Sequence, residues 1–118
     1  RKPDGGAWIV GQEKPDRDGR ALLGVIELVE AAVATSGDYR HTAEIDGRVV
    51  SHTMDPRTGA PLAGDLAQAT VVAETCMAAD AWATALLVAG REAGTALARH
   101  RGLTAFLVDR DGRSHEVR

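Results

Sequence analysis

The sequence predicts an α+β fold of two layers, in which a mainly antiparallel sheet carries two consecutive helices on one face. Three observations lead to this prediction. Short apolar segments separated by turn residues fill residues 7–73. Two segments of helical composition then follow one another, at 76–89 and 92–100. A last pair of strand-like segments closes the chain after the second helix.

Eight segments have the apolar and β-branched content of strands. They cover residues 7–11, 21–28, 31–35, 39–45, 48–53, 69–73, 103–108 and 114–117. Turns are predicted at 15–19, 36–38 and 111–112. The strongest hairpin signal is Asp46-Gly47, because Asp-Gly suits a two-residue turn between paired strands. Prolines and glycines between 56 and 64 mark a long loop before the 69–73 strand.

The segment 76–89 is predicted to be a helix because it is rich in Ala and Leu and contains neither Gly nor Pro. Thr75 is placed to cap its N-terminus and Gly90 to end it. A shorter helix at 92–100 is expected to stop at Gly102. Because the first helix is apolar almost all round, we expect it to be buried.

Asp80 is the only charged residue within the first helix, and Thr84 lies one turn further on. The i,i+4 spacing places the carboxylate and the hydroxyl on one face. A buried carboxylate needs a partner or a metal, and this pair of hard oxygen donors suits Mg²⁺. Mg²⁺ takes six ligands, so water and phosphate would supply the others. Two simpler interpretations stay open: Asp80 gains from the helix macrodipole, and Thr84 bonds back to its own backbone.

The loop that begins at His52 is a second candidate. Pro56 fixes one corner of a turn, Asp55 is placed to cap that turn with its side chain, and Gly59 suits a positive φ. These turn roles leave His52 unexplained. It is either a ligand-contacting donor or base at the end of a hairpin strand, or an ordinary surface residue.

Ser36-Gly37-Asp38 is a third candidate. A glycine between two short polar residues can present backbone N–H groups and a hydroxyl to the phosphate or ribose of a nucleotide. The same tripeptide is also a common turn sequence.

Composition narrows the function classes. The 118 residues are enough for one small domain with a single core. The net charge of −3, with acids and bases interspersed, argues against a nucleic-acid-binding surface. The single Cys76 excludes an intrachain disulfide and a cysteine-based zinc site.

Three motifs occur in a fixed order: Ala34-Thr35-Ser36-Gly37-Asp38-Tyr39, His52-x-x-Asp55-Pro56-x-Thr58-Gly59, and Ala79-Asp80-Ala81-x-Ala83-Thr84-Ala85-Leu86. In this order and at this spacing they resemble the ApbE family, the FAD:protein FMN transferases. The resemblance covers nearly the whole chain, from Trp8 to the 103–108 strand. It implies a T-fold-like half of an ApbE domain.

The resemblance also implies a reaction. Members of the family are Mg²⁺-dependent enzymes that cleave FAD, attach the FMN half to a threonine hydroxyl of a target protein and release AMP. Some members hydrolyse FAD to FMN and AMP instead. A flavin-binding or assembly module without turnover is the alternative from another class.

Residue by residue, Asp80 and Thr84 match the metal-binding aspartate and threonine of the family. Ala83 matches a position near the metal that is acidic in some members, and here it offers only a backbone oxygen. Met54 falls where the family has an aliphatic residue that contacts the flavin nucleotide. His52 matches the motif histidine near FAD, and Asp55 the loop aspartate.

Two points stay open at this stage. Thr53 stands where the motif more often has isoleucine, and the residues do not choose between His52 and Asp55 as the base for the attacking threonine.

The expected partners follow from the resemblance. They are FAD, a target protein that carries the acceptor threonine, and the N-terminal part of the domain, which brings further FAD contacts and another piece of the metal site. Because the chain begins Arg1-Lys2-Pro3 without an initiator Met, we expect it to be a fragment or a processed product. The resemblance implies that it is the C-terminal part of a single domain. Apolar surface left uncovered would favour a homo-oligomer or association with the N-terminal part. The parent protein is expected to be bacterial, and its compartment is left open between membrane-anchored outside the cytoplasm and cytoplasmic.

Overall fold

A computed structural model describes residues 1–16, 19–39 and 42–118. Within them the chain forms eight strands and two helices. In chain order these are β1 (Trp8–Glu13), β2 (Leu22–Leu28), β3 (Ala32–Gly37), β4 (Thr42–Ile45), β5 (Arg48–Ser51), β6 (Leu66–Ala73), α1 (Cys76–Ala89), α2 (Arg91–His100), β7 (Thr104–Asp109) and β8 (Ser114–Val117). The predicted turn at 15–19 and the predicted strand at 39–45 each lie partly outside the described residues.

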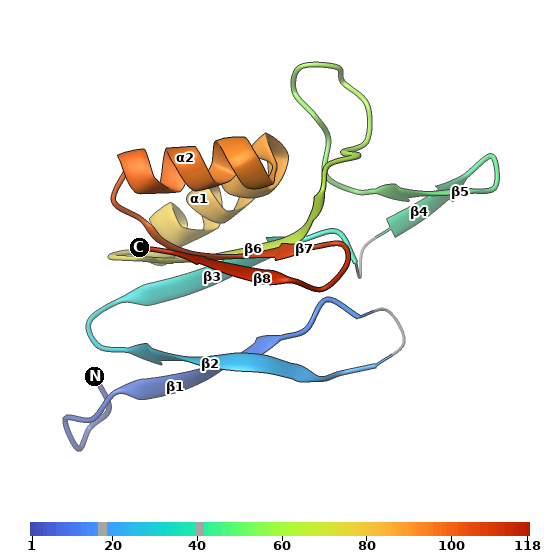
Figure 1. The fold of residues 1–118 in the computed structure, drawn as a ribbon. Coiled ribbons are helices and arrows are strands. Elements are labelled where there is room, and N and C mark those ends of the chain that lie inside the picture. The colour runs from blue at the N-terminus through green and yellow to red at the C-terminus, as the bar shows by residue number, and fades with distance from the viewer. Residues whose placement is uncertain (17–18, 40–41) are drawn as a thin grey trace.

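The main sheet has the strand order β3-β6-β7-β8, and every neighbouring pair is antiparallel. Its inner strand β6 is buried over most of its length, from Leu66 to Val71. Both helices lie on one face of this sheet (Figure 1), and α1 packs on β3 and β6 while α2 packs on α1, β7 and β8. The predicted α+β architecture is therefore confirmed.

Helix α1 begins and ends where the sequence predicts. The Thr75 hydroxyl accepts a hydrogen bond from the backbone N–H of Ala78 at 3.2 Å, and Gly90 takes a positive φ of 82°. Its buried side consists of small and branched apolar residues that belong to the core: Ala79, Ala83, Leu86 and Leu87.

The prediction that α1 is buried, with Asp80 as a buried carboxylate, is wrong for the outer face of the helix. Its outer face is open, with Met77 82% exposed and Asp80 and Thr84 also exposed. The helix has the sheet on one side and, among the described residues, no second layer on the other. Alanine fits both environments because its side chain is small, so the composition did not reveal which side would be covered.

The β1–β2 hairpin lies along the other face of the sheet as an additional layer (Figure 1). Polar side chains join the two layers, and of these Gln12 and Thr70 are buried while Thr35 is exposed. The Gln12 amide donates to the Thr70 hydroxyl at 3.1 Å, and the Thr35 and Thr70 hydroxyls lie 2.8 Å apart. The outward side of the hairpin keeps Val25 and Ile9 more than half exposed.

The β4–β5 hairpin projects from the body of the molecule (Figure 1). Its turn confirms the Asp-Gly signal, because Asp46 and Gly47 have φ values of 51° and 72°, the left-handed values that a two-residue hairpin turn requires.

The prediction of a turn at 36–38 is wrong for its first two residues. Ser36 and Gly37 continue β3, where they pair with Ala69 and Gln68 of β6. Glycine is needed here for close packing, since a Cβ on Gly37 would lie 2.9 Å from the Tyr39 ring and 3.0 Å from the Ala67 carbonyl oxygen.

Neither α1 nor α2 is both long and apolar enough to cross a membrane.

Candidate functional site

The Thr84 hydroxyl of α1 meets a hydroxyl of β3 at the edge of the sheet. Asp80 and Thr84 both lie on the open face of the helix. The Ser36 Oγ lies 2.7 Å from the Thr84 Oγ1, a hydrogen bond across 48 residues of sequence. We call Asp80, Thr84 and Ser36 the hydroxyl–carboxylate group.

The two donors on α1 suit a hard cation, since they are a carboxylate and a hydroxyl. Among the described residues, no three His, Cys, Asp or Glu side chains converge as metal ligands. Asp80 and Thr84 alone leave coordination positions of a bound Mg²⁺ open, and water or a phosphate-bearing molecule can fill such positions.

Ala83 is placed differently. Its side chain is fully buried in the core, and a carbonyl inside a helix accepts the N–H four residues further on. The Ala83 side chain is thus directed away from the open face that carries Asp80 and Thr84, and only its backbone oxygen is a candidate ligand.

The His52 loop follows β5. His52 is exposed, and Met54, which is 50% exposed, pairs with Pro61 through an isolated backbone bridge. Asp55 forms the expected turn: its carboxylate accepts from the Arg57 backbone N–H at 2.9 Å, and its carbonyl accepts from the N–H of Gly59 at 2.8 Å.

Asp55 also pairs with the Arg57 guanidinium at 2.9 and 2.8 Å. The side-chain hydrogen bonds from Arg57, followed by its backbone N–H, hold the pKa of Asp55 below its usual value. A carboxylate stabilised in its charged form is a weaker base.

Asp38 is buried and paired with Arg110. It is 3% exposed and receives two hydrogen bonds from Arg110, at 3.2 and 2.6 Å. Arg110 also donates to the Gly64 carbonyl at 2.6 Å. Sequence reasoning missed Arg110 because it lies 72 residues from its partner, beside an ordinary turn.

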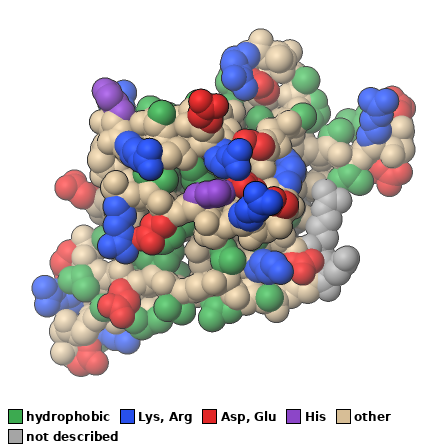
Figure 2. Space-filling view, viewed as in Figure 1, with side chains coloured by type: hydrophobic (Ala, Val, Ile, Leu, Met, Phe, Trp, Pro, Cys, Tyr) green, Lys and Arg blue, Asp and Glu red, His purple; other side chains and the backbone are tan. Residues whose placement is uncertain are grey.

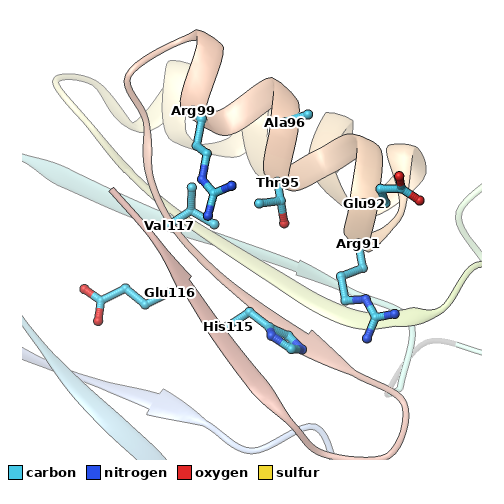
Figure 3. A pocket seen from close by; sticks show the side chains of 8 residues that line it. All are labelled: Arg91, Glu92, Thr95, Ala96, Arg99, His115, Glu116 and Val117. Carbon is cyan, nitrogen blue, oxygen red and sulfur yellow. The ribbon is translucent and has the colours of Figure 1, made fainter.

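The opposite edge of the sheet has a separate feature, a hollow of about 790 Å³ between α2 and β8 (Figure 3). Arg91 and Arg99 reach toward it from the helix and His115 from the strand. Arg91 and His115 both bond to the buried carboxylate of Asp109, at 3.1 and 2.9 Å.

On the face shown in Figure 2, acidic and basic side chains are interspersed over the described residues.

Fold and site together define an α+β domain with hard oxygen donors at the edge of its sheet. The model of the ApbE family matches residues 1–107. The chain belongs to the ApbE family, as its three motifs predict.

The relatives in this family carry a functional name. The FAD:protein FMN transferase of Escherichia coli K12 is 37% identical over 114 residues, which cover 97% of this chain and 32% of that protein. The FAD:protein FMN transferase of Vibrio cholerae O395 is 41% identical, over 89% of this chain and 31% of that protein. The chain thus spans about a third of the length of the curated relatives it matches.

Solved structures give the same result for the fold. The apo form of the flavinyl transferase ApbE from Pseudomonas stutzeri has a TM-score of 0.77 and 41% identity, covering 100% of this chain and 37% of that one. The ApbE protein of Thermotoga maritima has a TM-score of 0.83 and 32% identity, covering 95% of this chain and 36% of that one.

Proposed function

We propose that the protein containing these residues transfers the FMN part of FAD to a threonine hydroxyl of a target protein and releases AMP. Family membership supports the activity, since the relatives are named FAD:protein FMN transferases. The observation that carries the proposal is the hydroxyl–carboxylate group, where Asp80 and Thr84 are exposed one turn apart on α1 and Ser36 of β3 bonds to Thr84.

Mg²⁺ fits this donor set. Asp80 and Thr84 would hold it through their side chains, and Ala83, whose side chain is in the core, would contribute at most its backbone oxygen. When bound, the ion would neutralise negative charge on the pyrophosphate oxygens of FAD.

The protein's own residues then position the nucleotide and move a proton. The threonine oxygen attacks the phosphorus on the FMN side of the pyrophosphate, the bond from that phosphorus to the bridging oxygen breaks, and AMP leaves with the electron pair. We assign the base to His52, because Asp55 is already paired with Arg57 and holds a lowered pKa. Met54 offers half-exposed apolar surface to the flavin nucleotide.

The remaining part of the site lies outside residues 1–118 in this proposal. The family relatives are about three times as long, and a dinucleotide needs donors on both sides of a cleft. Residues 1–118 would then be the C-terminal part of one flavin-transferring domain.

Asp80 tests the metal assignment. In the full-length protein, Asp80→Asn should abolish Mg²⁺-dependent turnover of FAD and leave the fold intact, and Thr84→Val should weaken turnover because one neutral ligand is lost. Glu74→Gln is the matched control, since it removes an equal charge from an exposed residue just before α1. Full activity of Asp80→Asn at low Mg²⁺ would show that the assignment is wrong.

His52 tests the base. His52→Ala should lower turnover by about 10²- to 10⁴-fold, the usual contribution of general base catalysis, with little change in melting temperature. His100→Ala, at the exposed end of α2, is the control. Wild-type kinetics in His52→Ala would return His52 to the role of a surface residue.

The alternative reactions are separated by their products. FAD incubated with the protein and an acceptor gives a labelled acceptor for a transferase and free FMN for an FAD pyrophosphatase. Unchanged FAD would identify a binding or assembly module.

A further inference from the structure

The hydrogen bond between Ser36 and Thr84 joins the edge strand of the sheet to the open face of α1. The two oxygens lie 2.7 Å apart. Ser36 is half-buried in β3 and Thr84 is exposed in α1. Because α1 packs on β3, the packing of the two elements fixes the relative positions of the Ser36 and Thr84 backbones.

A threonine hydroxyl has one proton and two lone pairs. To bind a cation it must direct a lone pair at the ion and its proton away from it. Inside a helix, the proton of a threonine commonly goes back to the carbonyl one turn earlier. An acceptor on the neighbouring strand instead draws the proton away from the helix and holds the hydroxyl in one rotational orientation.

We infer that Ser36 is a positioning residue. It accepts the proton of Thr84 and thereby directs a Thr84 lone pair toward a divalent cation shared with Asp80. This inference rests on the proposed function, because it deepens the metal site assigned there. Ser36 acts through Thr84 and is not itself a ligand.

The chain offers a closely matched control. Thr35, the neighbouring residue in β3, makes a hydroxyl–hydroxyl bond of 2.8 Å with Thr70. Alternation along a strand places Thr35 on the opposite face of the sheet from Ser36. Removing the Thr35 hydroxyl therefore removes the same kind of bond at a point away from Asp80.

The test measures the binding of Mn²⁺ to the full-length protein without FAD, by electron paramagnetic resonance titration. Ser36→Ala should raise the Mn²⁺ Kd about 10- to 100-fold, the usual effect of losing a residue that orients a metal ligand. Thr35→Ala should leave the Kd unchanged, and Ser36→Thr, which keeps the hydroxyl, should stay close to wild type. If Ser36→Ala does not fold, Ser36→Cys gives the same comparison, because sulfur is a weak acceptor.

The double variant decides whether Ser36 acts through Thr84. On a Thr84→Val background, Ser36→Ala should weaken Mn²⁺ binding no further, and an additive loss would overturn the inference. An unchanged Kd in Ser36→Ala would also overturn it, as would weakened FAD binding with unchanged Mn²⁺ binding, which would make Ser36 a nucleotide contact. Failure of the metal site itself is distinguishable, since Asp80→Asn and Thr84→Val would then bind Mn²⁺ like wild type.

Discussion

Arg110 and Asp38 form an ion pair in which the partners differ sharply in exposure. The Asp38 side chain is 4% exposed and that of Arg110 is 43% exposed. With its further bond to the Gly64 carbonyl, the guanidinium holds the end of β3, the long loop and the end of β7 together. A buried carboxylate that loses its cation keeps its desolvation penalty.

We therefore expect Arg110→Met to destabilise the fold by about 1–3 kcal/mol, a value reduced from that of a fully buried pair because the guanidinium is partly in solvent. The double variant Asp38→Asn/Arg110→Met should recover part of this loss. Urea unfolding measures both. Arg113→Met removes an exposed ion pair on the same turn and is the control; an equal loss there would contradict the explanation.

Asp109 is a second buried carboxylate. Burial raises its pKa, but the hydrogen bond and charge of His115 and the charge of Arg91 outweigh this effect and hold the pKa below the ordinary value of 3.8. One of its oxygens, Oδ1, is buried and has no hydrogen-bond partner among the described residues.

A folded-state pKa below the unfolded value means that the ionised Asp109 contributes stability above about pH 4, and that this contribution is lost as the pH falls through the lowered pKa. The free energy of unfolding of wild type minus that of Asp109→Asn should thus be largest near neutral pH and shrink toward pH 2. Denaturant unfolding across this range measures it. The exposed Asp111→Asn serves as the control, and a difference for Asp109→Asn that does not vary with pH would rule out this linkage.

At the scale of elements, the two helices pack tightly at Gly94. A Cβ at this position would lie 3.0 Å from the Leu86 carbonyl oxygen of α1. Alanine has the higher intrinsic helix propensity, by about 1 kcal/mol. The backbone of a helix packed on a sheet cannot move aside easily, so the steric term is the larger one.

Gly94→Ala should therefore destabilise the domain by about 1–2 kcal/mol despite the better helix former. The change in melting temperature of Gly94→Ala relative to wild type shows whether the substitution stabilises or destabilises the domain. In Gly24→Ala the added Cβ meets nothing within 4 Å, so no loss is expected there. A stabilised Gly94→Ala would mean that α1 and α2 can separate slightly without loss of packing.

At the scale of the molecule, apolar side chains remain uncovered on two faces. They include Met77 on α1 and, on or next to β1 and β2, Trp8, Ile9, Leu22, Val25 and Val29; Ile45, Val49 and Met54 are also exposed, on the β4–β5 hairpin and the loop after it. Uncovered apolar surface of this kind favours association with another protein surface.

We expect residues 1–118 alone to self-associate, to bind FAD weakly and to transfer no FMN, because the donors on the other side of the proposed cleft are absent and solvent screens those that remain. Light scattering and FAD fluorescence titration measure the two properties. Adding the separately expressed N-terminal segment should restore Mg²⁺-dependent flavinylation of an acceptor. Tight FAD binding by residues 1–118 alone would show that the site is self-contained.

Local signals in the sequence predicted the elements well. Thr75 and Gly90 set the ends of α1 at the predicted residues, and Asp46-Gly47 set the β4–β5 turn. Caps and tight turns depend on a few neighbouring residues, so the sequence alone contains the needed information. The end of β3 was misjudged because Ser36 and Gly37 have turn propensity but pair with β6, and tertiary pairing overrides a weak local preference.

The sequence by itself determined the family, the element order and the placing of Asp80 one turn before Thr84, since each depends on residues close in the chain or on motifs in fixed order. Only the tertiary structure decided that α1 keeps an open face, that Ser36 meets Thr84 and that Arg110 neutralises Asp38. The last two contacts join residues 48 and 72 positions apart. They exist because the sheet brings β3 beside β6 and beneath α1, and the end of β7 near the end of β3. No local pattern of residues encodes which distant side chains such packing brings together.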